Sequence, residues 1–234
     1  QAARFGIDLA NATGILRKVV SVQGWPTPRL FKAFGEIVPE GHSMVSTMIA
    51  RESWEDFEQF VREEGGIIAS SALEGKGPYK APLTEFVFGH ALVQIQKSQP
   101  KRAVLEGFFR DSDLAGLIER VYKKVGHYGP MRVELARMSG ELVGTGSPYF
   151  LYESPEQMAA LVAEMQGAGG LVANSHTANV RQVGKKEITA RDLAFKRAVD
   201  PYGLLNPGRF EADDEADAKF DFALPTDAWT ERLG

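Results

Sequence analysis

The sequence predicts an α+β fold with a largely antiparallel sheet and helices packed mainly on one face. Two observations lead to this prediction. The alternating segments 131–138 and 141–147 are joined by the turn residues Ser139 and Gly140, which is typical of a β-hairpin. The segments within residues 102–173 follow the order β-α-β-β-α-β, which is the split unit of ferredoxin-like folds. Helices segregated to one face of an antiparallel sheet define the α+β class.

The first third of the chain alternates between helical and extended patterns. Ser53, with Asp56 three residues later, predicts a helix that begins with a capping box, and Gly65 predicts its end. In chain order the expected elements are a helix closed by Gly14, a strand over 15–22, a short helix over 30–37, a strand over 42–50, the helix that begins at Ser53, and a strand over 67–70.

The remainder of the chain supplies the split unit and a last helix. The expected elements are a loop over 73–80, a helix over 82–97, a strand over 102–109, a helix opened by Asp111, the hairpin, a helix capped by Ser154, a strand over 171–173, and a helix over 189–199 capped by Thr189 and Asp192. The helix that follows Asp111 has an apolar inner face of Leu114, Leu117, Ile118, Val121 and Val125. The acidic stretch 211–221 is expected to be a solvated surface segment.

Composition excludes several classes of function. The 234 residues carry 27 basic and 31 acidic side chains, a net charge of −4, so nucleic acid is not an expected partner. The absence of cysteine removes disulfides, thiolate nucleophiles and Cys-ligated metals. No apolar stretch approaches the roughly 18 residues of a membrane span. The chain also has neither a Gly-x-Gly-x-x-Gly motif after a strand nor a P-loop, so it has no nucleotide cradle of its own.

The four histidines do not stand at the spacing of a local metal site, and we expect no metal. His42 and His127 lie in polar, turn-like surroundings and are expected at the surface. His90 falls between Phe86 and Val93 on the apolar side of the expected 82–97 helix. This pattern indicates either a core histidine with a hydrogen-bond partner or a helix that lines a cleft.

A dense polar group follows the short strand at 171–173. It consists of Asn174, Ser175, His176 and Thr177, in a position where loops commonly carry ligand-binding groups. A neutral imidazole there could accept a proton or donate a hydrogen bond to a substrate. The alternative is that Asn174 and Thr177 cap turns while His176 is solvated.

The most distinctive segment runs from Phe195 to Phe210. Asp200-Pro201 and Asn206-Pro207-Gly208 hold an irregular backbone behind a cationic helix end. These residues are explained either as a helix stop and a turn, or as a rigid loop whose Asn206 amide and Arg209 meet a polar or anionic group.

This segment, Asp200-Pro-Tyr-Gly-Leu-Leu-Asn-Pro-Gly-Arg209, resembles the C-terminal signature of FAD-linked oxidases and dehydrogenases of the vanillyl-alcohol oxidase superfamily. Residues 170–177 and the helix that carries His90 are similar to one branch of these flavoenzymes. The resemblance covers nearly the whole chain, as the family's second half. It implies that another domain binds most of the FAD, while this chain is the cap domain that covers the flavin and forms much of the substrate pocket.

The resemblance also implies the division of the chain and the roles of its residues. Residues 1–14 would link to an N-terminal flavin domain, 15–188 would be the cap, 189–210 a helix and loop returning toward the flavin domain, and 211–234 an acidic tail. By the same resemblance, His176 and His90 would be catalytic, Asn174 and Thr177 would bind the substrate, and Asn206 and Arg209 would close the last loop against the flavin domain.

The sequence lacks the His-rich, Gly-Asp-Gly-Asn-containing metal motif of the lactate- and glycolate-type members, so a metal-assisted 2-hydroxy-acid oxidation is not expected. The expected partners are a flavin-binding domain or subunit and a small-molecule substrate. Because the diphosphate cradle is absent, the chain alone is expected to hold no FAD tightly and to be inactive. The expected location is the cytoplasm. The alternative is a non-catalytic binding or assembly module related to such caps, and a generic ligand-binding α+β domain is a third interpretation.

Overall fold

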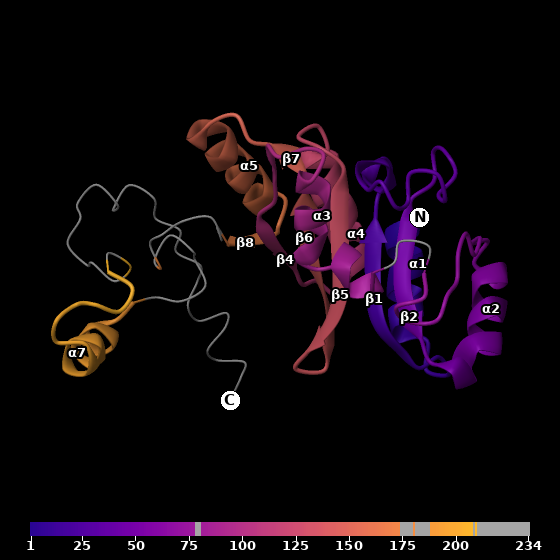
Figure 1. Cartoon of the computed structure of the whole chain (residues 1–234), viewed down its shortest axis with the longest axis horizontal. Helices are drawn as coiled ribbons and strands as arrows, with labels where there is room; N and C mark the ends of the chain where they lie inside the picture. Colours follow the sequence, from indigo (N-terminus) through magenta and orange to yellow (C-terminus); the bar gives the residue numbers. More distant parts are fainter. Residues whose placement is uncertain (78–80, 174–179, 181–187, 208, 210–234) are drawn as a thin grey trace. The chain divides into compact units, whose positions relative to one another are not determined.

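The computed structural model describes residues 1–77, 81–173, 180, 188–207 and 209. The chain forms two compact units, residues 1–170 and residues 171–234, and each is described by itself. A mostly antiparallel sheet combined with helices confirms the predicted α+β class (Figure 1).

The main sheet has six strands among the described residues, and its order reproduces the predicted split unit. Its strands are, in spatial order, β2 (Met44–Ile49), β1 (Arg17–Gln23), β5 (Met131–Met138), β6 (Glu141–Pro148), β4 (Glu106–Phe109) and β8 (Leu171–Ala173). Strand β6 lies between β4 and β5, which are successive in the chain, and β4 lies between β6 and β8. Strands β1 and β2 extend the sheet beyond β5 by antiparallel pairing. A second, two-stranded sheet pairs β3 (Arg102–Ala103) with β7 (Phe150–Leu151).

Three helices of the first unit form a layer on one face of this sheet. They are α1 (Ala2–Asn11), α4 (Leu114–Val125) and α5 (Pro155–Gly167), and α4 contacts both of the others. All five predicted inner-face residues of α4 are buried. Helix α2 (Trp54–Glu63) lies beside the edge strand β2 (Figure 1), where Phe57 and Val61 join the apolar cluster of α1.

The opposite face of β1 and β5 is polar. Side chains alternate along a strand, so Val20 and Val22 meet α1 while Ser21 and Gln23 point away from it. Ser21 pairs in register with Glu134, and Gln23 pairs with Arg132. These four side chains are all buried, although no apolar residue is among them. The segment around Phe86 and Phe88 covers this face, with α3 (His90–Gln96) directly after it.

The predicted helix over 82–97 is wrong as a single element. The structure has a 3-10 turn, Leu83–Phe86, followed by α3, and Phe88 between them adopts a left-handed φ of 53°. A residue in this conformation cannot continue a right-handed helix, so the chain changes direction there.

The predicted strand over 102–109 is also divided. Its first two residues pair with β7 in one sheet, and its last three pair with β6 in the other. Between them the Leu105 N–H donates to the Ser147 hydroxyl at 3.0 Å instead of to a main-chain acceptor. A side chain therefore interrupts the ladder.

Three other expectations for the first third of the chain are wrong. Helix α1 ends at Asn11, before Gly14. Residues 67–70 form no strand, and Ile67 is 71% exposed, so this segment lacks the partner that a strand requires. The expected helix over 30–37 is a 3-10 turn, Thr27–Leu30, followed by turns, one of them closed by a hydrogen bond from the Val38 N–H to the Phe34 carbonyl.

Helix α4 is capped by Asp113, whose side chain accepts from the Gly116 N–H, and not by Asp111 as expected. Of the caps predicted at Ser53, Ser154 and Thr189, two form. The Ser154 hydroxyl accepts from the Gln157 N–H, and Thr189 and Asp192 make a full capping box at the start of α7 (Ala190–Val199). The buried Ser53 hydroxyl makes no cap bond and accepts instead from the Leu16 N–H at 2.9 Å. Its position against β1 decides its partner.

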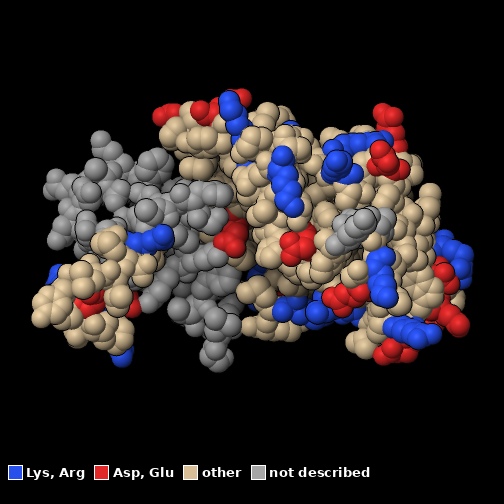
Figure 2. Space-filling view, in the orientation of Figure 1, with Lys and Arg blue, Asp and Glu red and all other residues tan. Residues whose placement is uncertain are grey.

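Among the described residues, no helix combines the length and apolar character needed to cross a membrane. On the side of the molecule seen in Figure 2, the Lys and Arg side chains of the described residues are interspersed with Asp and Glu.

Candidate functional site

Half of the sequence-predicted site residues lie outside the described residues. These are Asn174, His176 and Thr177, so their roles stay predictions. His90 belongs to the first unit, and Asn206 and Arg209 belong to the second. All three are exposed.

His90 is the first residue of α3, and its side chain is 67% exposed. The expectation that it lies on an apolar helix face is wrong, and so is its interpretation as a core histidine. The cause is the chain reversal at Phe88, which separates His90 from the helical turn of Phe86. Val93, the other apolar residue of the predicted face, is 57% exposed.

A carboxylate orients the His90 ring. The Nδ1 atom lies 3.1 Å from Oε1 of Glu85, and Oε2 of Glu85 accepts from Gln94 Nε2 at 3.4 Å. A proton on Nδ1 would donate to Glu85 and leave Nε2 of the neutral ring as an acceptor. The pair thus presents a proton-accepting nitrogen at an exposed position.

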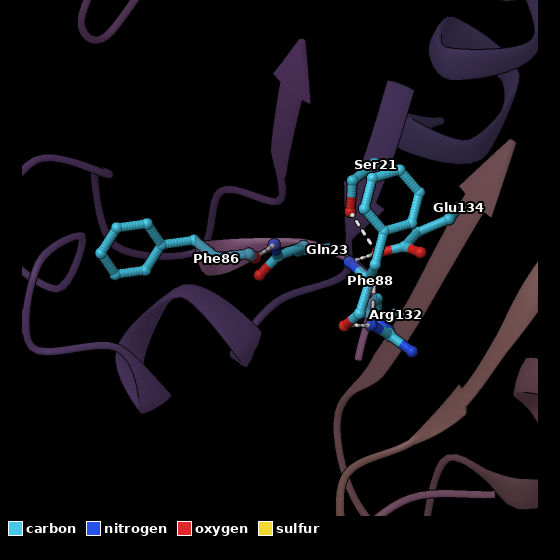
Figure 3. A network of polar contacts seen from close by, with 6 residues as sticks. All are labelled: Ser21, Gln23, Phe86, Phe88, Arg132 and Glu134. Atoms are coloured by element: carbon cyan, nitrogen blue, oxygen red, sulfur yellow. Dashed lines mark hydrogen bonds and ion pairs between the residues drawn. The ribbon is translucent and has the colours of Figure 1, made fainter. Parts of the chain in front are cut away.

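A buried polar network binds the backbone between Glu85 and His90 (Figure 3). The Phe88 N–H donates to Glu134 Oε1, and Arg132 Nη1 donates to the Phe88 carbonyl. Arg132 also contacts Glu134 Oε1 at 3.2 Å, and Gln23 Nε2 donates to the Phe86 carbonyl at 3.1 Å. The main chain of residues 86–88 is therefore bound directly to the polar face of the sheet.

The charges of this network are strongly shielded from water. The Arg132 and Glu134 side chains are 9% and 5% exposed. Burial raises the pKa of Glu134, against the opposing effects of Arg132 and of the hydrogen bonds from Phe88 and Ser21. Burial likewise raises the pKa of Tyr149, whose ring lies 5.7 Å from the Arg132 guanidinium carbon. Gln23 Oε1, Arg132 Nε and the Tyr149 hydroxyl have no partner among the described residues.

In the second unit, the segment that follows α7 folds around the Asp200 carboxylate. Its two oxygens accept from the Leu204 and Leu205 N–H groups, each at 2.9 Å, and Lys196 donates to the same carboxylate. Gly203 and Asn206 adopt left-handed φ values of 65° and 48°. The Asp-Pro-x-Gly-x-Leu-Asn pattern is thus a closed loop in which the aspartate binds the backbone four and five residues ahead.

Acid should open this loop. The hydrogen bond from Lys196, together with the Leu205 and Leu204 amides, lowers the pKa of Asp200. A carboxyl with a lowered folded pKa stabilises the fold above its unfolded pKa, and this contribution is lost as the pH falls through the folded pKa. We expect the Leu204 and Leu205 amides to lose exchange protection as the pH falls below 3.8, the ordinary pKa of an aspartate, and through the lowered pKa of Asp200. The measurement is hydrogen exchange by NMR. An Asp200→Asn variant should lack this pH dependence, and unchanged protection of the wild type in acid would contradict it.

The sequence reasoning missed Glu85, Arg132 and Glu134. Glu85 stands five residues before His90, and in an unbroken helix that spacing would not place the two side chains together. Arg132 and Glu134 alternate with Met131, Val133 and Leu135, a pattern that indicates a solvated strand face. Their burial under residues 86–88 is a long-range contact without a local signal. Among the described residues, no group of three or more acidic or histidine side chains is placed to hold a metal ion.

Comparison with known proteins adds no identification. No family model matches the chain. No curated protein matches it significantly.

Proposed function

We propose that this chain is the substrate (cap) domain of an FAD-dependent oxidoreductase that oxidises a small organic substrate by hydride transfer to the flavin. The Glu85–His90 pair carries the proposal, because it offers an imidazole whose Nδ1 is held by a carboxylate and whose Nε2 is open to a substrate. The flavin supplies the redox step, and the protein supplies orientation and proton transfer.

Each residue has a stated part in this proposal. Nε2 of His90 accepts a proton from the substrate group that is oxidised, and Glu85 keeps the ring in the required tautomer and stabilises the imidazolium. His176 is the second proposed catalytic residue, with Asn174 and Thr177 as substrate-binding residues.

The FAD would be held mainly by a partner flavin-binding domain or subunit. The exposed Asn206 and Arg209 fit a role at its surface, since an amide and a guanidinium pair readily with flavin carbonyls or phosphates. The closed loop around Asp200 keeps this region of the backbone fixed.

The complete enzyme tests the proposal. We expect His90→Ala to slow substrate-driven flavin reduction by about 10²- to 10⁴-fold, the usual contribution of a general base. The measurement is stopped-flow bleaching of the oxidised flavin with a substrate found by screening small alcohols and amines. His42→Ala is the matched control, because His42 is also exposed and its Nδ1 also has an oxygen partner, the Glu40 carbonyl at 3.0 Å. Equal rates for the two variants would remove the catalytic role of His90.

The alternative function is a non-catalytic module that binds a flavoprotein subunit. It is favoured by α7, which has no buried residue, and by the apolar side chains around it, of which Phe195 is 68% and Tyr202 85% exposed. Both functions place the FAD elsewhere, so FAD that copurifies tightly with this chain alone would contradict both. Flavin reduction that is insensitive to every proposed catalytic residue would favour the module.

A further inference from the structure

The buried pair Arg132–Glu134 binds the backbone of Phe88, which lies between Glu85 and His90 in the chain. Glu85 lies in the 3-10 turn Leu83–Phe86, and His90 is the first residue of α3. Phe88 lies between them. Both main-chain polar groups of Phe88 are bound by this pair, its N–H by Glu134 and its carbonyl by Arg132 (Figure 3).

We propose that Arg132 and Glu134 are positioning residues, which hold the Phe88 reversal so that His90 meets Glu85. The inference rests on the proposed function only for its catalytic consequence. The geometric part concerns contacts within this chain and can be tested without a flavin.

The backbone of Phe88 needs such support. A phenylalanine with a φ of 53° is in a conformation that L-residues avoid, and such residues persist only where their surroundings hold them. Phe88 is 47% exposed, so packing of its side chain supplies only part of this support. The two main-chain hydrogen bonds to charged, buried partners are the strong contacts at this residue.

Helix α3 cannot fix the position of His90 by itself. It has seven residues, and a helix of this length is marginal without tertiary support. Its buried residues, Ala91 and Ile95, anchor the side away from solvent, while His90 occupies the first, least constrained turn. The chain enters that turn through Gly89 and Phe88, and the pair binds the backbone of Phe88, two residues before His90.

Among the described residues, Glu85 is the charged group that contacts the His90 ring. Glu85 lies 3.1 Å from Nδ1, and Gln94 binds the other oxygen of Glu85. Arg132 and Glu134 bind the backbone of Phe88, two residues before His90. Loss of the pair should consequently change the geometry of the imidazole without removing its carboxylate partner from the chain.

The test is the tautomer of His90 in the 234-residue chain, read from the nitrogen resonances of ¹⁵N-labelled histidine where the rings are neutral. In the wild type we expect Nδ1 to carry the proton. The double variant Arg132→Met, Glu134→Leu replaces the buried pair by apolar groups, a change that folds tolerate well. We expect it to lose the Nδ1–H preference at His90. Glu134→Gln, which keeps an oxygen for the Phe88 N–H, should retain it.

Two controls separate positioning from general stability. His42 should keep its resonances in the double variant, because its Nδ1 contacts the Glu40 carbonyl. Phe109→Leu, on the other face of the sheet, should leave His90 unchanged. A folded double variant that retains the Nδ1–H form overturns the proposal. A second measurement does not depend on whether that variant folds: the Phe88 amide of the wild type must exchange slowly with solvent. Exchange at the rate of an unstructured peptide would overturn the proposal that Arg132 and Glu134 hold the Phe88 backbone.

The outcome is distinguishable from that of the proposed function. If the double variant alters the tautomer while His90→Ala leaves flavin reduction unchanged in the complete enzyme, the positioning role of Arg132 and Glu134 stands and the catalytic role of His90 fails. If His90→Ala slows flavin reduction and the double variant leaves the tautomer unchanged, the catalytic role of His90 stands and the positioning role of Arg132 and Glu134 fails.

Discussion

Replacement of Glu134 by alanine is expected to lower the free energy of unfolding by about 3–5 kcal/mol, the usual cost of removing one partner from a buried ion pair. The change would leave the Arg132 guanidinium buried without its carboxylate and the Phe88 N–H without its acceptor. Urea denaturation followed by circular dichroism measures the loss.

A surface glutamate provides the matched control. Glu119 is 59% exposed and pairs with Lys123 one helical turn along α4. Because solvent screens such pairs, Glu119→Ala should cost less than about 1 kcal/mol. Glu134→Gln should cost less than Glu134→Ala, since it preserves an oxygen opposite Phe88. A loss for Glu134→Ala as small as that for Glu119→Ala would show that the buried network contributes little to the fold.

The second large effect is expected at Phe109, whose side chain is fully buried on the helix-covered face. Its ring occupies a space left by glycines, because a Cβ at Gly144 would lie 3.3 Å from the ring and one at Gly170 would lie 3.2 Å from it. Phe109→Ala would therefore open a cavity beneath the α4–α5 layer, at a cost of about 3–5 kcal/mol. Equilibrium denaturation again gives the value.

An exposed phenylalanine tests whether burial is the cause. Phe195 is 68% exposed on α7, so Phe195→Ala should change the stability by no more than about 0.5 kcal/mol. Similar losses at Phe109 and Phe195 would contradict the assignment of Phe109 to the core. A large loss at Phe109 with a small one at Phe195 would confirm that burial is the cause.

The elements predicted correctly from the sequence are those defined by local contacts. Helix α4 has five buried residues at helical spacing, the β5–β6 hairpin turns at Ser139 and Gly140, and α5 begins with the Ser154 cap. In each case the residues that specify the element lie within a few positions of one another. Their pattern therefore carries the same information in the sequence as in the fold.

Three of the predictions that fail do so because a distant residue decides the outcome. Ser53 is a good cap by sequence, yet its hydroxyl binds the Leu16 N–H. The strand over 102–109 divides because β7 takes its start and the Ser147 hydroxyl takes the Leu105 N–H. The helix over 82–97 breaks because Glu134 and Arg132 bind the backbone of Phe88.

The candidate site shows the same division. The sequence by itself determined the α+β class, the split β-α-β-β-α-β order and the choice of His90 as a residue of interest, because periodicity and residue type are local properties. Only the tertiary structure brought Glu85 to His90 and buried Arg132 with Glu134 beneath residues 86–88. These contacts join segments up to 46 residues apart. They form because the buried Arg132 and Glu134 bind the main-chain groups of Phe88, and no local pattern encodes that long-range contact.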